Sequence, residues 1–208
     1  MTNPPQSGNF LGKADLDILS AVVLEHYGQW FHSLYHGVQA VEKYLKAKFI
    51  ALHENKGENG YEVYQKNEKL LKTHNLVKLW SAVELLEPSY QSFPWKEELP
   101  MLSEFDQVTR YPYVGQKVIN GMCSSDLELC LLVALQVRPN TVFQKDDYPL
   151  GMALRGYRLE DPTDVKPTPA AQILKEYFPD ADALVWWPDK PPGATLVRRL
   201  PYIRAELP

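Results

Sequence analysis

Proline placement constrains the fold of this chain more than any other feature of its 208 residues. Of the 17 prolines, six lie before residue 139 and eleven lie in the final 70 residues. Because proline breaks helices and cannot donate a ladder hydrogen bond, long regular elements are expected only before residue 139. The sequence therefore predicts a helical domain over residues 1–138 and a proline-rich appendage over residues 139–208.

Apolar residues before residue 139 recur at spacings of three and four, the period of amphipathic helices. The longest such segment covers residues 29–54, and its stripe is Trp30, Leu34, Val38, Val41, Leu45, Phe49 and Leu52. A helix over residues 13–27 precedes it, and its predicted buried stripe is Leu16, Leu19, Val23 and Tyr27. Residues 55–67 are rich in Lys, Glu, Asn and Gly and are predicted to form a loop.

Three further helices follow from capping and proline signals. Thr73 is the predicted N-cap of a helix that ends before Pro88 and buries Leu76, Leu79, Trp80, Val83 and Leu86. The next begins near residue 98 or 100 and stops at Arg110, because Pro112 disfavours helical geometry at Tyr111. The last begins at a capping box of Ser125 and Glu128, is apolar on most sides, and ends before Pro139.

About five helices joined mostly by short links predict an all-α fold, an antiparallel up-down bundle. The appendage is expected to hold one short helix that begins at Thr168 and Pro169. Its apolar runs over residues 183–187 and 195–200 would pair as a small β-hairpin. Because these runs would otherwise expose a large apolar patch, the appendage is expected to pack on the bundle.

Charge and cysteine content narrow the class of protein. A net charge of −4 argues against a basic surface that coats nucleic acid, although residues 36–78, with eight lysines and five glutamates, leave room for a local anion site. No apolar run is long enough to span a bilayer, and the first ten residues do not form a signal peptide. Cys123 and Cys130 lie two helical turns apart, too far for a disulfide, so a cytoplasmic protein without a membrane partner is expected.

One face of the predicted 29–54 helix is polar. At 100° per residue, an arc of about 80° opposite the apolar stripe holds His32, His36, Gln39, Lys43 and Lys46. This arc is either one wall of a phosphate-binding groove or a solvated helix face. His32 and His36 have the i,i+4 spacing of metal ligands, but no glutamate follows His32 and no carboxylate lies within the arc, so we expect no metal and no cofactor.

Two other places could contact an anion. Arg110, at a forced helix end beside Tyr111, could grip phosphate in a bidentate manner, or it could satisfy helix carbonyls and pair with Asp106. His74 follows the Thr73 cap, where the first turn of a helix offers free N–H groups, although a surface histidine explains it equally well.

Three segments in this order resemble the HEPN family, the higher eukaryote and prokaryote nucleotide-binding domains. Residues 32–46 read His-Ser-Leu-Tyr-His-Gly-Val-Gln-Ala-Val-Glu-Lys-Tyr-Leu-Lys and are similar to the long helix of that family. Residues 72–76, Lys-Thr-His-Asn-Leu, and residues 105–112, Phe-Asp-Gln-Val-Thr-Arg-Tyr-Pro, resemble two further family segments. The resemblance covers about residues 13–138 and does not extend to the appendage.

The resemblance implies an antiparallel helical bundle, often a homodimer, that interacts with nucleotides or RNA. It also implies a nucleotidyltransferase partner in toxin–antitoxin pairs. One branch of the family consists of metal-independent RNases with an arginine followed four to six residues later by histidine. Here the first arginine is Arg110 and the last histidine is His74, so this motif is absent and no catalytic residues are assigned.

The sequence thus favours a non-catalytic HEPN-like protein, in a toxin–antitoxin or stress setting, that binds a nucleotide or other phosphate ligand, a nucleotidyltransferase-type partner, or both. The expected ligand-binding residues are Lys43, Lys46, His36, Gln39, His74, Arg110 and Tyr111. The lysines would neutralise phosphate, Arg110 would grip it, and Tyr111 or His74 would stack or hydrogen-bond. The alternatives are an RNase that uses His36 or His74 with Arg110, and a pure interaction or dimerisation module.

Overall fold

The computed structural model describes residues 6–93, 96–110 and 124–138. Within these ranges the chain forms seven α-helices, two short 3-10 helices and no strand, which confirms the all-α prediction. The α-helices are α1 (Gln6–His26), α2 (Trp30–Glu54), α3 (Gly60–Lys66), α4 (Glu68–Leu71), α5 (Leu76–Leu86), α6 (Leu99–Arg110) and α7 (Ser124–Val137). The 3-10 helices are Pro88–Ser92 and Lys96–Glu98. The predicted helix and hairpin of the appendage lie outside the described residues.

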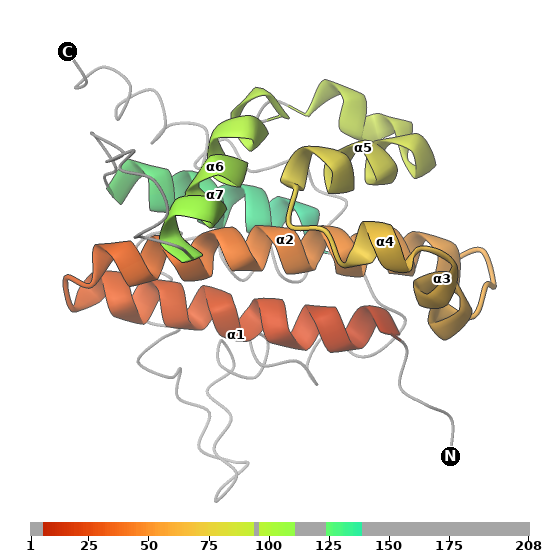
Figure 1. Ribbon diagram of the computed structural model, residues 1–208, viewed down its shortest axis with the longest axis horizontal. Helices are drawn as coiled ribbons and strands as arrows, with labels where there is room; N and C mark the ends of the chain where they lie inside the picture. Colours follow the sequence, from red (N-terminus) through yellow and green to blue (C-terminus); the bar gives the residue numbers. More distant parts are fainter. Residues whose placement is uncertain (1–5, 94–95, 111–123, 139–208) are drawn as a thin grey trace, which may run out of the picture.

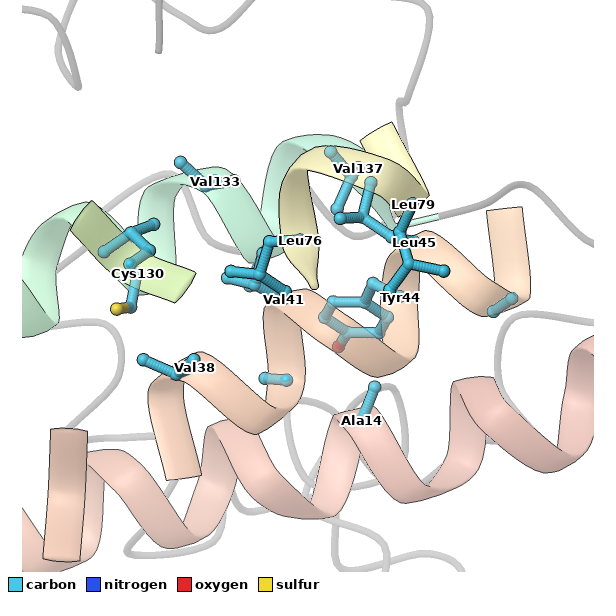
Figure 2. Close-up of a cluster of buried hydrophobic side chains, with 14 of the residues drawn as sticks. Ala14, Val38, Val41, Tyr44, Leu45, Leu76, Leu79, Cys130, Val133 and Val137 are labelled. Atoms are coloured by element: carbon cyan, nitrogen blue, oxygen red, sulfur yellow. The ribbon is translucent and has the colours of Figure 1, made fainter. Parts of the chain in front are cut away.

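Helix α2 is the centre of the described structure. Figure 1 shows α1 and α2 as two long antiparallel helices, with α5, α6 and α7 on the other side of α2. Buried side chains from α1, α2, α5 and α7 meet in one core, part of which is drawn in Figure 2. The apolar α7 is buried at each position whose side chain is described, as its sequence predicts.

Helix α7 lies close to α2 at Gly37. A Cβ atom added there would lie 3.0 Å from Leu127 Cδ1 and 3.0 Å from Cys130 Cβ. Real Cβ contacts are rarely this short, so a glycine lets the two helices pack closely.

A helix C-cap with Gly28 joins α1 to α2. The N–H of Gln29 donates to the Leu24 carbonyl at 2.8 Å, and the N–H of Gly28 donates to the Glu25 carbonyl at 2.8 Å. These two bonds are those of a Schellman motif, which places the C′ residue in the left-handed region. Gly28 has φ +72° and lies between the two helices predicted over residues 13–27 and 29–54.

Replacing Gly28 by alanine is expected to lower the free energy of unfolding by about 1–2 kcal/mol, because L residues with a Cβ are strained at positive φ. Nothing lies within 4 Å of the added Cβ, so the cost comes from the backbone alone. Gly28→Asn should cost less, since asparagine tolerates this conformation. Urea denaturation measures both variants, and a Gly28→Ala protein as stable as the wild type would contradict this account of the turn.

The buried stripe predicted for the first helix was wrong at Leu16 and Tyr27, whereas Leu19 is partly buried against the core. Leu16 is 54% exposed and Tyr27 is 73% exposed. The buried apolar side chains of α1 are Leu11, Ala14, Ile18, Ala21 and Val22. The two alanines let α1 lie close to α2, so the face with small residues turns inward and the face with Leu16 and Tyr27 turns outward.

The loop predicted over residues 55–67 was wrong from residue 60 onward, because α3 lies there. The Asn59 side chain caps this helix by accepting the N–H groups of Tyr61 at 3.0 Å and Glu62 at 3.3 Å. Val63 is buried in the core and anchors the short helix. Local capping and one apolar anchor therefore outweigh the polar composition of the segment.

The predicted N-cap of α5 was also wrong, by two residues. The Asn75 side chain caps the helix by accepting the Lys78 N–H at 2.9 Å, whereas Thr73 Oγ1 accepts the Asn75 N–H at 3.2 Å. The predicted buried positions Leu76, Leu79, Trp80 and Val83 are confirmed, and Leu86 is partly buried against them. His74 consequently lies before α5 and not in its first turn, so it does not gain from the free N–H groups there.

Candidate functional site

The polar face of α2 contacts a carboxylate from α1 at one place, which we name the Asp17 cluster (Asp17, His36 and Lys43). Asp17 Oδ1 lies 2.9 Å from His36 Nδ1, and Asp17 Oδ2 accepts a hydrogen bond from Lys43 Nζ. His36 and Lys43 are seven residues apart on α2, but both side chains reach the same carboxylate. Asp17 is buried, whereas His36 and Lys43 are partly exposed.

A second group, the His74 cluster (Glu42, Lys46 and His74), joins α2 to the segment before α5. Lys46 Nζ donates to Glu42 Oε1 at 2.6 Å, and His74 Nδ1 lies 2.9 Å from Glu42 Oε2. The Glu42 and Lys46 side chains are only 4% and 5% exposed, whereas that of His74 is 52% exposed. A buried ion pair thus supports a histidine at the surface.

The two clusters share one composition, a lysine and a histidine on the two oxygens of one carboxylate. With neutral imidazoles each cluster has no net charge, because the ammonium balances the carboxylate. Each lysine that the sequence assigns to phosphate is therefore already neutralised by a carboxylate in the structure.

A third group, the Asp15 cluster (Asp15, Tyr44 and Arg138), is fully buried. Arg138 donates to both Asp15 oxygens at 3.0 Å, and the Tyr44 hydroxyl donates to Asp15 Oδ1 at 2.5 Å. Burial raises the pKa of the Tyr44 phenol well above its usual range, and the nearby Asp15 carboxylate raises it further. Burial alone would lower the pKa of Arg138, but Asp15 more than compensates, so that pKa is raised. The cluster fixes the residue after α7 to α1.

The buried Tyr44 phenol predicts a stability loss in alkali. Since its pKa is raised in the folded state, its contribution is complete below the unfolded value near 10.0 and declines as pH rises above it. We expect Tyr44→Phe to cost about 1 kcal/mol near pH 9 for the lost hydrogen bond, and this difference to shrink near pH 11. Urea midpoints at both pH values test this, and a difference that stays constant would contradict the assigned role of the phenol.

The structure separates the expected ligand-binding residues into exposed and buried groups. His36, Lys43 and His74 reach the surface, whereas Gln39 and Lys46 are buried. The face of α2 is thus not solvated along its whole length. Arg110 is the last described residue of α6, so the predicted helix stop lies at the edge of the described residues. The side chains of Arg110 and Asp106, and all of Tyr111, lie outside them.

Sequence reasoning missed Asp15, Asp17 and Arg138. Both aspartates lie in the apolar run Ala-Asp-Leu-Asp-Ile-Leu of α1, and charged groups in such a run need partners when buried. That run was the available signal, but it does not identify the partners, which come from α2 and from beyond α7.

Comparison with known proteins adds no assignment: no protein family, curated protein or solved structure matches the chain. In the described ranges no helix is long and apolar enough to cross a bilayer. The same residues contain no group of three or more His, Cys, Asp or Glu side chains arranged to hold a metal ion.

Proposed function

We propose that this chain is a non-catalytic HEPN-like module that binds a nucleotide or another phosphate-bearing ligand beside α2. The observation that carries the proposal is the contact between Glu42 and His74, which are 32 positions apart. It joins two of the three segments that resemble the family, residues 32–46 and residues 72–76. Residues 32–46 lie in α2 and residues 72–76 end at the first residue of α5, and the contact between Glu42 and His74 brings these two segments together.

The described part of the third segment, residues 105–110, also lies near α2 and α5. These residues belong to α6, which packs against both of those helices. The Leu76 N–H donates to Ser103 Oγ of α6 at 3.4 Å, and Phe105 is buried in the core. In Figure 1 the last described turn of α6 lies over the first half of α2, and the two helices are in contact. This arrangement supports a shared site that includes Arg110.

The exposed groups have direct roles in this proposal, and the buried groups support them. Lys43 exchanges part of its contact with Asp17 for a phosphate oxygen, and His36 and His74 supply hydrogen bonds. Lys46 and Gln39 lie beneath this surface, and Lys46 balances the charge of Glu42. Because the lysines are already paired, we expect modest affinity that weakens with salt.

Calorimetric titration with ATP, AMP and pyrophosphate tests the proposal. Lys43→Ala should weaken binding by about tenfold or more, since hydrogen bonds to charged groups contribute about 1.5–3 kcal/mol. Arg110→Ala is expected to have an effect of the same size. The matched control is Lys66→Ala, which removes the same charge from an exposed position on α3. Equal loss in Lys43→Ala and Lys66→Ala, or no binding by the wild type, would refute the site.

A metal-independent RNase is the second candidate function. It is favoured by one observation, that His36 and His74 each place Nδ1 on a carboxylate, the arrangement that orients a histidine general base. Turnover of RNA by purified protein in the presence of a chelator, lost in His36→Ala or His74→Ala, would support this reading over the non-catalytic one.

The resemblance also extends the proposal to partners, namely a second copy of the chain and a nucleotidyltransferase-type protein. A cytoplasmic toxin–antitoxin or stress setting belongs to the same proposal. Light scattering of the purified chain measures its oligomeric state. A monomer at all concentrations would remove the homodimer from the proposal.

A further inference from the structure

The contact between Asp17 and His36 determines which ring nitrogen of His36 carries hydrogen. Asp17 Oδ1 lies 2.9 Å from His36 Nδ1, and an ionised carboxylate can only accept hydrogen bonds. Nδ1 must therefore be the protonated nitrogen of the ring. In the neutral imidazole the lone pair is then on Nε2, so Nε2 is a hydrogen-bond acceptor.

Lys43 completes this arrangement with a donor. Its ammonium group contacts the other oxygen of the same carboxylate, so the two head groups are held near each other by Asp17. Both side chains are partly exposed. With the imidazole in its neutral form, the Asp17 cluster thus presents a cationic donor and a hydrogen-bond acceptor next to each other at the surface.

We infer that the Asp17 cluster recognises a ligand that has a hydroxyl or N–H donor close to its phosphate, as a ribonucleotide has in its ribose hydroxyls. This inference rests on the proposed function and specifies its ligand. An ionised phosphate oxygen carries no hydrogen and cannot donate to Nε2, so the ionised phosphate oxygens of a nucleotide satisfy Lys43 but not His36. A nucleotide without ribose hydroxyls lacks the donor that the ribose would supply to this acceptor.

The position of the His36 proton is measured without any ligand, from the imidazole nitrogen chemical shifts by NMR. Wild-type His36 should show a protonated Nδ1, and Asp17→Ala should move the proton toward Nε2. The exposed His32, one turn earlier on α2, is the internal control and should not change. A wild-type His36 protonated on Nε2 would overturn the inference and leave the proposed function intact.

Ligand selectivity is measured by titration of ATP against its dideoxy analogue, with pyrophosphate as the phosphate-only probe. Wild type should prefer ATP by about two- to tenfold, the factor that corresponds to one net hydrogen bond of about 0.5–1.5 kcal/mol. The preference should fall to about one in His36→Ala. Equal binding of ATP and its analogue by the wild type overturns this inference alone. Failure of the wild type to bind pyrophosphate or either nucleotide overturns the proposed function together with it.

Discussion

Replacing Arg138 by methionine is expected to lower the free energy of unfolding by about 3–5 kcal/mol, the cost of removing one partner from a buried ion pair. Arg138 donates two hydrogen bonds to Asp15, and both residues are buried. Methionine fills much of the space but supplies no charge, so the Asp15 carboxylate loses this countercharge in a site that water does not reach. Urea denaturation at neutral pH measures the effect.

Two further variants make this result specific. Lys66→Met removes a charge from an exposed position and should change stability by about 0.5 kcal/mol or less. The triple variant Asp15→Leu, Tyr44→Phe and Arg138→Met removes the whole Asp15 cluster and should recover most of the stability, because apolar packing often replaces a buried ion pair without loss. An Arg138→Met protein within about 0.5 kcal/mol of wild type would show that the pair does not hold α1 to the end of α7.

The helix boundaries were predictable where prolines and long apolar stripes define them. Helix α5 ends at Leu86 and α7 at Val137, in both cases shortly before a proline. Such signals are local, because a proline restricts its neighbours in any tertiary context. The short α3 was not predictable from composition, since its stability depends on the Asn59 cap and on burial of Val63.

The orientation of α1 shows that the apolar pattern of a single helix does not always predict which face is buried. Its large apolar residues Leu16 and Tyr27 share one face, and a pattern that weights size places that face inward. The structure instead buries the face with Leu11, Ala14, Ile18, Ala21 and Val22, and α1 packs on the long α2. Which face of α1 is buried depends on the helix that packs against it. The apolar pattern of α1 alone does not contain this information.

The residues that share the polar side of α2 were predictable, but the balance of their charges was not. A helical wheel placed His36, Lys43 and Lys46 on one side of α2, and the structure shows all three in polar contacts there. The wheel omits every other helix, and Asp17 comes from α1. Glu42 lies at the edge of the arc. Its contact with Lys46 is an i,i+4 pair within α2 and follows from the spacing, whereas its contact with His74 depends on the fold.

The second large effect is expected from Glu42→Gln, which should lower the free energy of unfolding by about 3 kcal/mol. The substitution keeps the shape of the side chain but removes the charge that balances Lys46, whose ammonium group is almost fully buried. Measured by urea denaturation, this loss should exceed that of Glu68→Gln. Glu68 is the matched control because its ion pair with Lys72 has the same i,i+4 spacing but is exposed to solvent.

The double variant Glu42→Leu and Lys46→Met separates the stability of the fold from the proposed site. It removes both buried charges, so its stability should return to within about 1 kcal/mol of wild type, as when buried ion pairs are replaced by apolar side chains. In this double variant His74 loses its carboxylate partner, which positions the imidazole ring. A hydrogen bond to a charged group contributes about 1.5–3 kcal/mol. If part of this free energy serves to position the ring for the ligand, nucleotide binding should weaken by about fivefold or more. A double variant that binds nucleotide like the wild type would show that the His74 cluster only supports the fold. A double variant as unstable as Glu42→Gln would show that the ion pair is not the reason for the loss.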